Sequence, residues 1–349
     1  METFARAGAL SGYFQVARRH GFNPQALLRQ VGLDAATLAN PEQRIPVSAG
    51  CQLLEASARE TKCPTFGLQM AELRQDFDFG VVGMLLAHKR TLREVLLASI
   101  QYRHLLNEAL GLHIETAAGK VIIREEVVSE LDVPTRQATE LAVGLLARTC
   151  NALLGQGWKP VSVHFAHAAP PDVRPYRRFF GCPVSFNSDF NGIVCAASDL
   201  DQPNPNADPE LVKYAESLAR PLDASRPESM TDEVRKAIYL LLPLEQASVD
   251  QVASHLHLSA RTLRRRLETA GTSFSDLLEE VRHNLAIRYL NNSRYPIGGV
   301  ATLLGYARQA SFTRWFTSGF GMTPRAWRTR QIEGVAHTAK SAAIETPLQ

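Results

Sequence analysis

The sequence predicts an α/β N-terminal domain over residues 1–220 and an all-α C-terminal domain over residues 232–330. Three observations support this. The first 220 residues alternate helix-like and strand-like patterns, as in mixed α/β folds. The last hundred or so place their apolar residues mainly at helical spacings of three and four. Between them, residues 221–231 are polar and contain two prolines, so this stretch is expected to be a linker.

Five segments of the N-terminal half are predicted to be helical from their apolar periodicity and flanking residues. They are Leu10–Arg19, Pro24–Val31, Val47–Thr61, Thr91–Ala109 and Pro134–Leu154. A sixth helix is expected at Pro209–Ala219, after a loop at Asp201–Pro209 that is rich in Pro, Asn and Asp. The apolar run Val81–Leu86 is interpreted as core.

Strands are predicted where apolar and polar residues alternate over short segments. Leu112–Thr116 and Val121–Glu125 alternate in this way on either side of the turn-like pair Ala118-Gly119. This pattern is typical of a β-hairpin. Val161–Phe165 and Ile193–Ala197 are predicted to be further short strands.

Residues 248–267 carry the pattern of two short helices joined by a tight turn. The first helix has one apolar face, formed by Val249, Val252, Ala253 and Leu256. After a break at His257-Leu258, Ser259 is placed to cap the second helix, because its hydroxyl can accept an early backbone N–H. Leu263 and Leu267 form the buried stripe of that helix. The arrangement is typical of a helix-turn-helix unit.

The same pattern recurs in residues 296–320. A first helix is expected at Pro296–Leu304, Gly305 supplies the turn, and a second helix is expected at Gln309–Phe320. The inward-facing residues of that second helix are expected to be Phe312, Trp315 and Phe316. The sequence therefore predicts two helix-turn-helix units.

One long amphipathic helix, Phe274–Asn292, is predicted to join the two units. Its nineteen residues at ~1.5 Å each span roughly 28 Å. One turn of DNA measures ~34 Å. Such a spacer suits two recognition helices that enter successive major grooves on one side of a duplex.

Arginine dominates the charge of residues 244–330. This segment holds twelve arginines, no lysine and six acidic residues, a net charge of +6, whereas the whole chain carries +3. Arginine suits bidentate contacts to phosphate and guanine. Arg261, Arg264 and Arg265 lie off the apolar stripe of the first unit's second helix, in its N-terminal half, which enters the major groove in such domains. Double-stranded DNA is therefore the expected partner.

Two stretches carry a family resemblance: LSARTLRRRLETAGTSF in the first unit, and VATLLGYARQASFTRWFTSGFGMTPRAWR in the second. Through them, residues 232–330 resemble the AraC/XylS family of bacterial transcription regulators. The resemblance implies DNA contacts from the start of each recognition helix. The residues concerned are Arg261, Arg264, Arg265, Gln309, Ala310, Ser311, Thr313 and Arg314, with weaker candidates for the DNA backbone at Ser259, Arg308 and Arg328.

The second unit departs from the family pattern. Ala307 and Arg308 stand where the family often has Ser and Asp, and a lost cap costs ~0.5–2 kcal/mol. Gly298-Gly299 weakens the preceding helix by up to ~1 kcal/mol per glycine. We therefore expect the first unit to supply more of the affinity. The second is expected to make promoter choice more dependent on half-site sequence and effector state.

The N-terminal half is similar to the arabinose-binding-type sensor domain of one branch of this family. The similarity rests on Tyr176–Pro183 (YRRFFGCP), Val184–Asn191 and Ala207–Leu211. It implies effector sensing, self-association as a homodimer, or both, and its label does not imply arabinose. The family further implies RNA polymerase as a partner and an activator role. Tyr102, Arg103 and His104 are candidates for a ligand pocket, but the sequence does not otherwise locate the effector site.

Composition favours a cytoplasmic protein without a metal or cofactor. No apolar run is long enough to span a membrane, and the N-terminus lacks the pattern of a secretory signal. The five dispersed cysteines form neither a disulfide framework nor a metal motif. A zinc site from His164 and His167 with Cys182 and Cys195 would require distant segments to converge. The tail, residues 331–349, is expected to be disordered.

Two enzymatic functions are alternatives to a transcription regulator. A DNA-repair alkyl-transfer protein of the Ada type carries a similar helix-turn-helix domain, but it needs clustered thiolates and a Pro-Cys-His-Arg nucleophile, which this sequence lacks. A sensor domain that acts catalytically on its own effector is the other. The sequence contains no Ser/His/Asp spacing, Walker motif or GxGxxG, so an enzyme is not expected.

Overall fold

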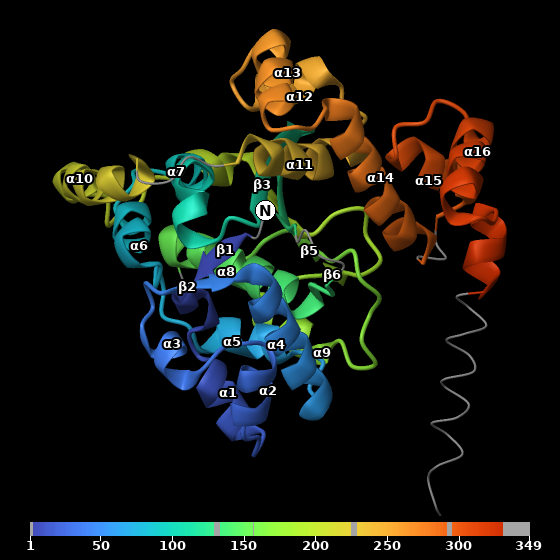
Figure 1. The fold of residues 1–349 in the computed structure, drawn as a ribbon. Helices are drawn as coiled ribbons and strands as arrows, with labels where there is room; N and C mark the ends of the chain where they lie inside the picture. Colours follow the sequence, from blue (N-terminus) through green and yellow to red (C-terminus); the bar gives the residue numbers. More distant parts are fainter. Residues whose placement is uncertain (1–2, 129–132, 156, 225–228, 292–294, 331–349) are drawn as a thin grey trace, which may run out of the picture. The chain divides into compact units, whose positions relative to one another are not determined.

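A computed structural model describes residues 3–128, 133–155, 157–224, 229–291 and 295–330 (Figure 1). The chain divides into two compact units, residues 1–232 and residues 233–349. The first unit holds both strands and helices, and the described part of the second is helical throughout. The predicted combination of an α/β and an all-α domain is thereby confirmed. The tail predicted to be disordered lies outside the described residues.

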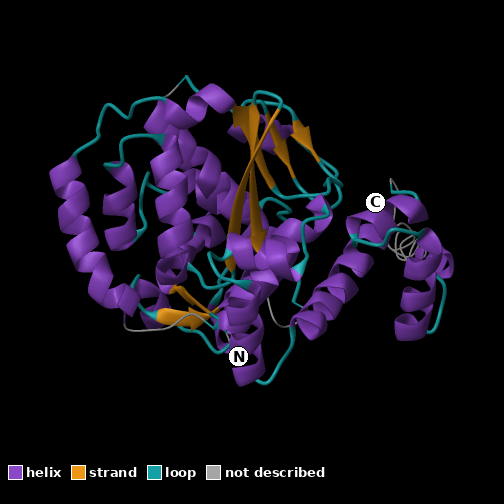
Figure 2. Cartoon of the chain, turned by 90° about the horizontal axis from the view of Figure 1, so that it is seen from above, coloured by secondary structure: helices purple, strands orange, loops and turns teal. Residues whose placement is uncertain are grey.

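A five-stranded sheet of order β3-β4-β7-β5-β6 forms the centre of the first unit (Figure 2). All neighbouring strands are antiparallel except β5 and β6. The strands are β3 (Leu110–Ala117), β4 (Lys120–Val127), β5 (Ser162–His164), β6 (Val184–Ser185) and β7 (Gly192–Ala196). A separate antiparallel pair joins β1 (Phe4–Arg6) to β2 (Arg44–Pro46). The predicted hairpin is present as β3 and β4, with Leu112 opposite Glu125.

The helices of the first unit include every segment predicted from periodicity. They are α1 (Tyr13–Arg19), α2 (Gln25–Gln30), α3 (Ala35–Ala39), α4 (Val47–Glu60), α5 (Phe66–Leu73), α6 (Gly80–Ala87), α7 (Leu92–Leu106), α8 (Arg136–Leu154), α9 (Arg174–Phe180) and α10 (Pro209–Ala224), with the 3-10 turns η1 (Ala7–Leu10) and η2 (Ala197–Asp201). The interpretation of Val81–Leu86 as core is confirmed, since Val82, Leu85 and Leu86 are buried.

Two predicted helices differ from the observed ones at their ends. The segment predicted as Leu10–Arg19 is split, because η1 ends at Leu10 and α1 begins only after Gly12, whose φ of +88° breaks the helix. The helix predicted to reach Ala109 ends at Leu106, because Asn107 is extended (φ −157°, ψ 112°). Strand β3 then starts at Leu110.

Helices α5 and α8 pack so closely that only a glycine fits at one contact. A Cβ on Gly67 would lie 2.1 Å from the carbonyl oxygen of Gln137. The Gln137 side chain reinforces the contact, because its Oε1 accepts a hydrogen bond from the Gly67 N–H at 2.8 Å. This contact holds α8 against α5 at one end, and α8 also packs on β4.

Helix α10 is longer than predicted. It was expected to end at Ala219, before Pro221, but it continues through Pro221 to Ala224. The segment 221–231, predicted as a linker, therefore includes the end of α10 and the start of α11 (Met230–Leu241). The domain bounds taken from the sequence remain a prediction.

In its described residues, the second unit contains α11, the short 3-10 turn η3 (Leu242–Leu244), a helical stretch over residues 324–330 and five further helices. These are α12 (Val249–His255), α13 (Ala260–Thr269), α14 (Phe274–Leu290), α15 (Ile297–Leu303) and α16 (Gln309–Phe320). Helices α14, α15 and α16 were predicted to within two residues at either end, and α12 and α13 lie on either side of the predicted break at His257-Leu258. Within the described parts of both units, no helix is long and apolar enough to cross a membrane.

Candidate nucleic-acid interface

Within residues 233–349, the first helix-turn-helix unit pairs α12 with α13 through a tight turn. Ser248 and Gln251 form a capping box that starts α12, with each side chain bonded to the other residue's backbone N–H. The helix ends in a Schellman motif, in which the Leu258 N–H donates to the Ala253 carbonyl at 2.8 Å. His257 takes the left-handed position of that motif (φ +55°). A four-residue connection, 256–259, thus joins the two helices.

Helix α13 presents its arginines on the face away from the core. Ser259 caps the helix as predicted, because its Oγ accepts the Thr262 N–H at 3.2 Å. Leu263 and Leu267 are fully buried. The exposed residues of the helix include Arg261, Arg264, Arg265 and Arg266. All three predicted base-contacting arginines are therefore accessible.

The second helix-turn-helix unit, formed by α15 and α16, repeats the same turn geometry. The Tyr306 N–H donates to the Ala301 carbonyl at 2.9 Å, which matches the Leu258 bond of the first unit. Gly305, with φ +73°, takes the left-handed position that His257 holds in the first unit. The connection to α16 comprises residues 304–308, one residue more than in the first unit.

Helix α16 starts without the capping bond that α13 has. Arg308 is the N-cap residue, and within the described chain its side chain makes no capping hydrogen bond. The predicted loss of a cap is thus confirmed. Gln309, Ala310 and Arg314 are exposed, as DNA contact would require, whereas the predicted contacts Ser311 and Thr313 are half-buried.

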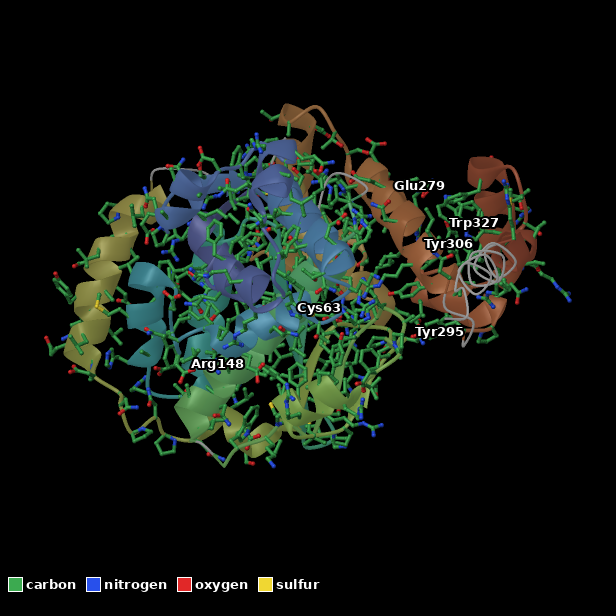
Figure 3. The ribbon with its side chains drawn as sticks, turned by 90° about the horizontal axis from the view of Figure 1, so that it is seen from below. Cys63, Arg148, Glu279, Tyr295, Tyr306 and Trp327 are labelled. Carbon is green, nitrogen blue, oxygen red and sulfur yellow. The ribbon has the colours of Figure 1, made fainter. Side chains whose placement is uncertain are left out.

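An aromatic cluster supports the rest of α16. Phe312 and Phe316 are fully buried as predicted, but Trp315 is only partly buried. The indole N–H of Trp315 donates to the Glu279 carboxylate of α14, and the Trp315 ring lies 5.7 Å from the Tyr306 ring between centroids. Glu279 and Tyr306 are labelled in Figure 3. Phe316 stacks on Phe320 with ring centroids 4.0 Å apart. Trp315 was predicted to face inward, but its indole lies at the edge of the helix, where Glu279 of α14 accepts its N–H.

Helix α14 lies against the second unit through further polar contacts. Arg282 donates from Nε to the Leu304 carbonyl at 3.0 Å, and its guanidinium lies 4.6 Å from the Tyr306 ring centroid. Burial raises the pKa of the Tyr306 hydroxyl to about 12, so the phenol stays neutral. His283 stacks on Phe320 at 4.2 Å. These residues fix the turn and the C-terminal end of the second unit to α14.

Arg328 belongs to the internal contacts of the unit. Its Nε donates to the Leu290 carbonyl at 3.1 Å, at the end of α14, and desolvation lowers the pKa of the guanidinium. The role of Arg282 was not predicted from the sequence. Its position on a helix face gave no signal, because only the packing of α15 on α14 brings the Leu304 carbonyl within reach.

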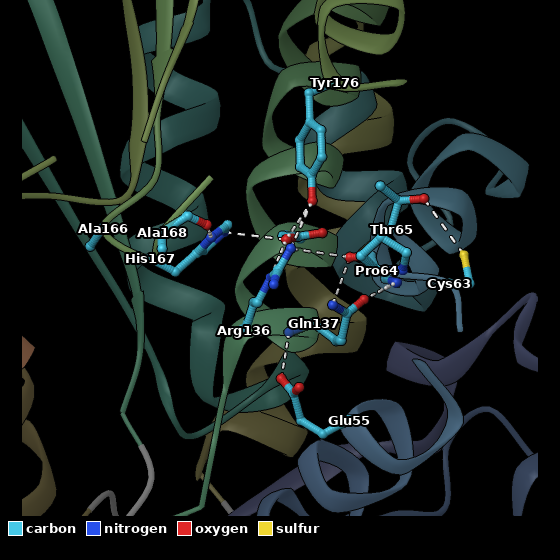
Figure 4. A network of polar contacts seen from close by, with 12 residues as sticks. Glu55, Cys63, Pro64, Thr65, Arg136, Gln137, Ala166, His167, Ala168 and Tyr176 are labelled. Carbon is cyan, nitrogen blue, oxygen red and sulfur yellow. Dashed lines mark hydrogen bonds and ion pairs between the residues drawn. The ribbon is translucent and has the colours of Figure 1, made fainter. Parts of the chain in front are cut away.

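The N-terminal unit brings one predicted histidine into a buried polar network (Figure 4). Glu140 accepts hydrogen bonds from Tyr176 Oη at 2.7 Å and from Arg136 Nε at 2.9 Å, and His167 Nε2 lies 3.3 Å from the same oxygen. Burial raises the pKa of Glu140 to about 7. His164 instead contacts the hydroxyls of Ser162 and Ser188.

No metal-binding group of three or more His, Cys, Asp or Glu residues occurs in the part of the chain that the structure describes. The zinc alternative built from His164, His167, Cys182 and Cys195 therefore receives no support from the geometry. The network around Glu140 joins α8, α9 and the loop after β5 and is interpreted as structural.

Comparisons with known proteins agree with this geometry. Residues 21–204 match the arabinose-binding domain of AraC transcription regulators, an N-terminal domain, and residues 236–330 match a helix-turn-helix domain. The HTH-type transcriptional regulator VirS of Mycobacterium tuberculosis is 31% identical over 329 residues, covering 93% of this chain and 96% of the relative. The ornithine utilization regulator of Pseudomonas aeruginosa is 26% identical over 311 residues, covering 88% and 91%.

A third relative matches about a quarter of the chain. The urease operon transcriptional activator of Escherichia coli is 35% identical over 86 residues, covering 25% of this chain and 29% of the relative.

The fold and the exposed recognition helices define a DNA-binding transcription regulator with a separate N-terminal domain. The matched families and relatives are transcription regulators and not enzymes. The chain belongs to the AraC family, in the branch whose N-terminal domain is of the arabinose-binding type.

Proposed function

We propose that this protein reads two successive major-groove half-sites in promoter DNA and activates transcription under the control of a small-molecule effector. The observation that carries the proposal is the pair of exposed recognition helices, α13 and α16, that flank the 17-residue helix α14. A helix of that length spans ~26 Å, against ~34 Å for one DNA turn. The remaining distance is within the reach of the connections at either end of α14.

The roles of the residues follow from their exposure. Arg261, Arg264 and Arg265 suit bidentate contacts to guanine, and Gln309 and Arg314 suit adenine and guanine. The half-buried Ser311 and Thr313 are proposed to contact DNA through their hydroxyls, and Ala310 through its methyl group. Ser259 and Arg308 lie at helix N-termini, which favour phosphate. For Arg328 the Leu290 contact supports a structural role, and a phosphate contact from it stays a prediction.

The test is a binding titration on promoter DNA with two half-sites about one turn apart. Scrambling either half-site is expected to lower the affinity, and the affinity is expected to fall steeply as salt rises. Footprinting should protect both half-sites on one side of the duplex. Equal affinity for promoter and random DNA would contradict the proposal.

The effector-controlled activator role extends what the family establishes. The name of the urease operon relative supports activation, and the match to the arabinose-binding type supports a sensing N-terminal domain. RNA polymerase is then the partner, and the cytoplasm is the proposed location. A reporter fused to the bound promoter measures the sign: expression that rises when the regulator is deleted would contradict activation.

Homodimer formation is proposed from an apolar stripe on α10. Leu211, Tyr214 and Leu218 recur on one face of this helix, and Tyr214 is 57% exposed. Two such helices can pair through this face. Analytical ultracentrifugation should give a dimer mass for the full chain and a monomer mass for Tyr214→Glu. A monomer in both cases would refute the homodimer.

A further inference from the structure

The N-terminal unit contains a cavity of about 160 Å³ beside the β3–β4 hairpin. Its walls come from the β1–β2 pair, the helices α4, α7 and α8, and the hairpin. Most of the lining is aliphatic, as shown by Ile45, Leu96, Leu141 and Val127. A dry cavity of ~150 Å³ with such walls accepts benzene. This cavity therefore has room for a single ring or a chain of about six carbons.

One carboxyl group lies among these apolar walls. On β4, Val121, Ile123, Glu125 and Val127 alternate onto the same face of the strand, so Glu125 takes a position that the pattern gives to apolar residues. Its side chain lines the cavity and is 6% exposed. Among the described residues, no hydrogen-bond partner reaches its Oε2.

The neighbouring Glu126 shows how unusual this is. Glu126 lies on the opposite face of β4, and the side-chain amide of Asn191 donates to its carboxylate at 3.0 and 3.1 Å. A buried polar atom normally has such a partner, because leaving it unpaired is costly. A bound molecule could therefore supply the hydrogen-bond partner that Glu125 Oε2 lacks among the described residues.

The chemistry of that molecule follows from the charges around the cavity. Burial raises the pKa of Glu125 to about 8, so its carboxyl is mostly neutral at pH 7 and can both donate and accept a hydrogen bond. Arg6, Arg74 and Arg103 also line the cavity, but Arg6 pairs with Glu42, Arg74 pairs with Asp78, and Arg103 donates to the Ile100 carbonyl. A neutral hydrogen-bonding group fits these surroundings better than a cation, which the arginines would repel.

We propose that this cavity is the effector site, and that its ligand is a small, largely apolar molecule whose hydroxyl or amide group pairs with the Glu125 carboxyl. This inference rests on the effector control proposed above. Of the residues that the sequence suggested for a pocket, Arg103 lines the cavity, whereas Tyr102 and His104 are not among its lining residues.

Isothermal titration of the full chain with benzyl alcohol, toluene, benzylamine and benzoate tests the proposal. Benzyl alcohol is expected to bind about tenfold more tightly than toluene, as one hydrogen bond to a buried partner provides. The two charged probes should bind more weakly than the alcohol. A stronger response to benzylamine or to benzoate would overturn the neutral-ligand assignment.

Two variants separate the carboxyl from the space. Glu125→Leu should lose the preference for benzyl alcohol and keep toluene binding, while Glu125→Gln should retain most of the preference. Ala142→Phe, which places an aromatic ring in the cavity from another lining position, should abolish binding of both probes. Glu72→Gln, an exposed carboxyl on α5, is the matched control and should bind like the natural chain. Unchanged binding in Ala142→Phe would overturn the proposal.

The same samples distinguish a failure of the cavity assignment from a failure of the proposed promoter reading. If promoter reading is intact but none of the probes binds, the cavity assignment fails and the proposed function stands. If the probes bind as expected but the chain does not discriminate promoter from random DNA, the proposed function fails. Binding of benzyl alcohol that leaves promoter affinity unchanged would overturn the assignment of the cavity as the effector site.

Discussion

The two helix-turn-helix units share one turn geometry but are stabilised in different ways. The first has a capped recognition helix and an aliphatic stripe of Leu263 and Leu267. The second lacks the cap, but its aromatic cluster and the contacts of α14 hold the far half of α16. The missing cap of the second helix-turn-helix unit therefore affects the first turn of α16, which is the part proposed to contact DNA.

The largest expected difference concerns the cores of the two recognition helices. Phe316→Ala should lower the free energy of unfolding by ~3–5 kcal/mol, and Leu267→Ala by ~2–5 kcal/mol. Phe316 should cost more, because it also stacks on Phe320 and packs edge-to-face against Trp327. Urea unfolding followed by tryptophan fluorescence measures both, with exposed Thr302→Ala as the control. A larger loss for Leu267→Ala would reverse this part of the comparison.

The second largest expected difference between the two helix-turn-helix units is in how strongly each discriminates promoter from random DNA. Arg265→Ala is expected to weaken promoter binding by ~1–3 kcal/mol more than it weakens binding to random DNA. Arg314→Ala should do the same by a smaller amount, because α16 begins uncapped. Arg266→Ala on the same helix as Arg265 is the control and should affect both DNAs alike. Equal losses for Arg265→Ala and Arg314→Ala would remove the asymmetry between the units.

The caps offer a reciprocal experiment. Ser259→Ala should cost ~0.5–2 kcal/mol of stability, and Arg308→Ser should gain a similar amount by supplying the missing cap. If Arg308 contacts phosphate, the gain in stability will come with weaker DNA binding and a salt dependence reduced by about one ion. Thermal unfolding and salt titrations measure the two effects separately. A loss of stability in Arg308→Ser would contradict the interpretation of the second unit.

The smallest expected effect lies in the turns. His257→Gly should stabilise the first unit by about 1 kcal/mol, because glycine adopts the left-handed conformation without strain. Gly305→Ala should destabilise the second unit, since a Cβ there would also lie 3.2 Å from Leu242 Cδ1. Denaturant midpoints compare the two variants. A stabilising Gly305→Ala would show that the turns are not equivalent.

The helices of both helix-turn-helix units could be predicted well from the sequence, because they combine strong apolar periodicity with recognisable ends. Ser259 and Gly305 mark helix ends by local chemistry alone, and both were found at the predicted places. The passage of α10 through Pro221 was missed, because local reasoning treats proline as a helix end. Strands as short as β6, with two residues, leave no alternation to detect.

Of the two candidate sites, the DNA-binding face could be predicted from local sequence, whereas the cavity could not. The exposed arginines of α13 could be inferred from the apolar stripe on the other side of the helix. The cavity could not, because Glu125 looks like an ordinary polar residue at the end of a predicted strand until α7 and α8 cover that face. The contacts of Arg282 and Arg328 with backbone carbonyls likewise depend on how helices pack and not on local sequence.

The contact between Arg282 and the Leu304 carbonyl bears on the spacing of the two half-sites that the protein is proposed to read. It couples the spacer helix α14 directly to the turn between α15 and α16. We therefore expect these three helices to move as one rigid body. The first unit joins that rigid body through residues 270–273, which form the only described connection between α13 and α14. Promoters whose half-sites are moved apart by one base pair, about 3.4 Å, would then be accommodated by this joint. Shortening the joint should narrow the range of spacings that the protein accepts.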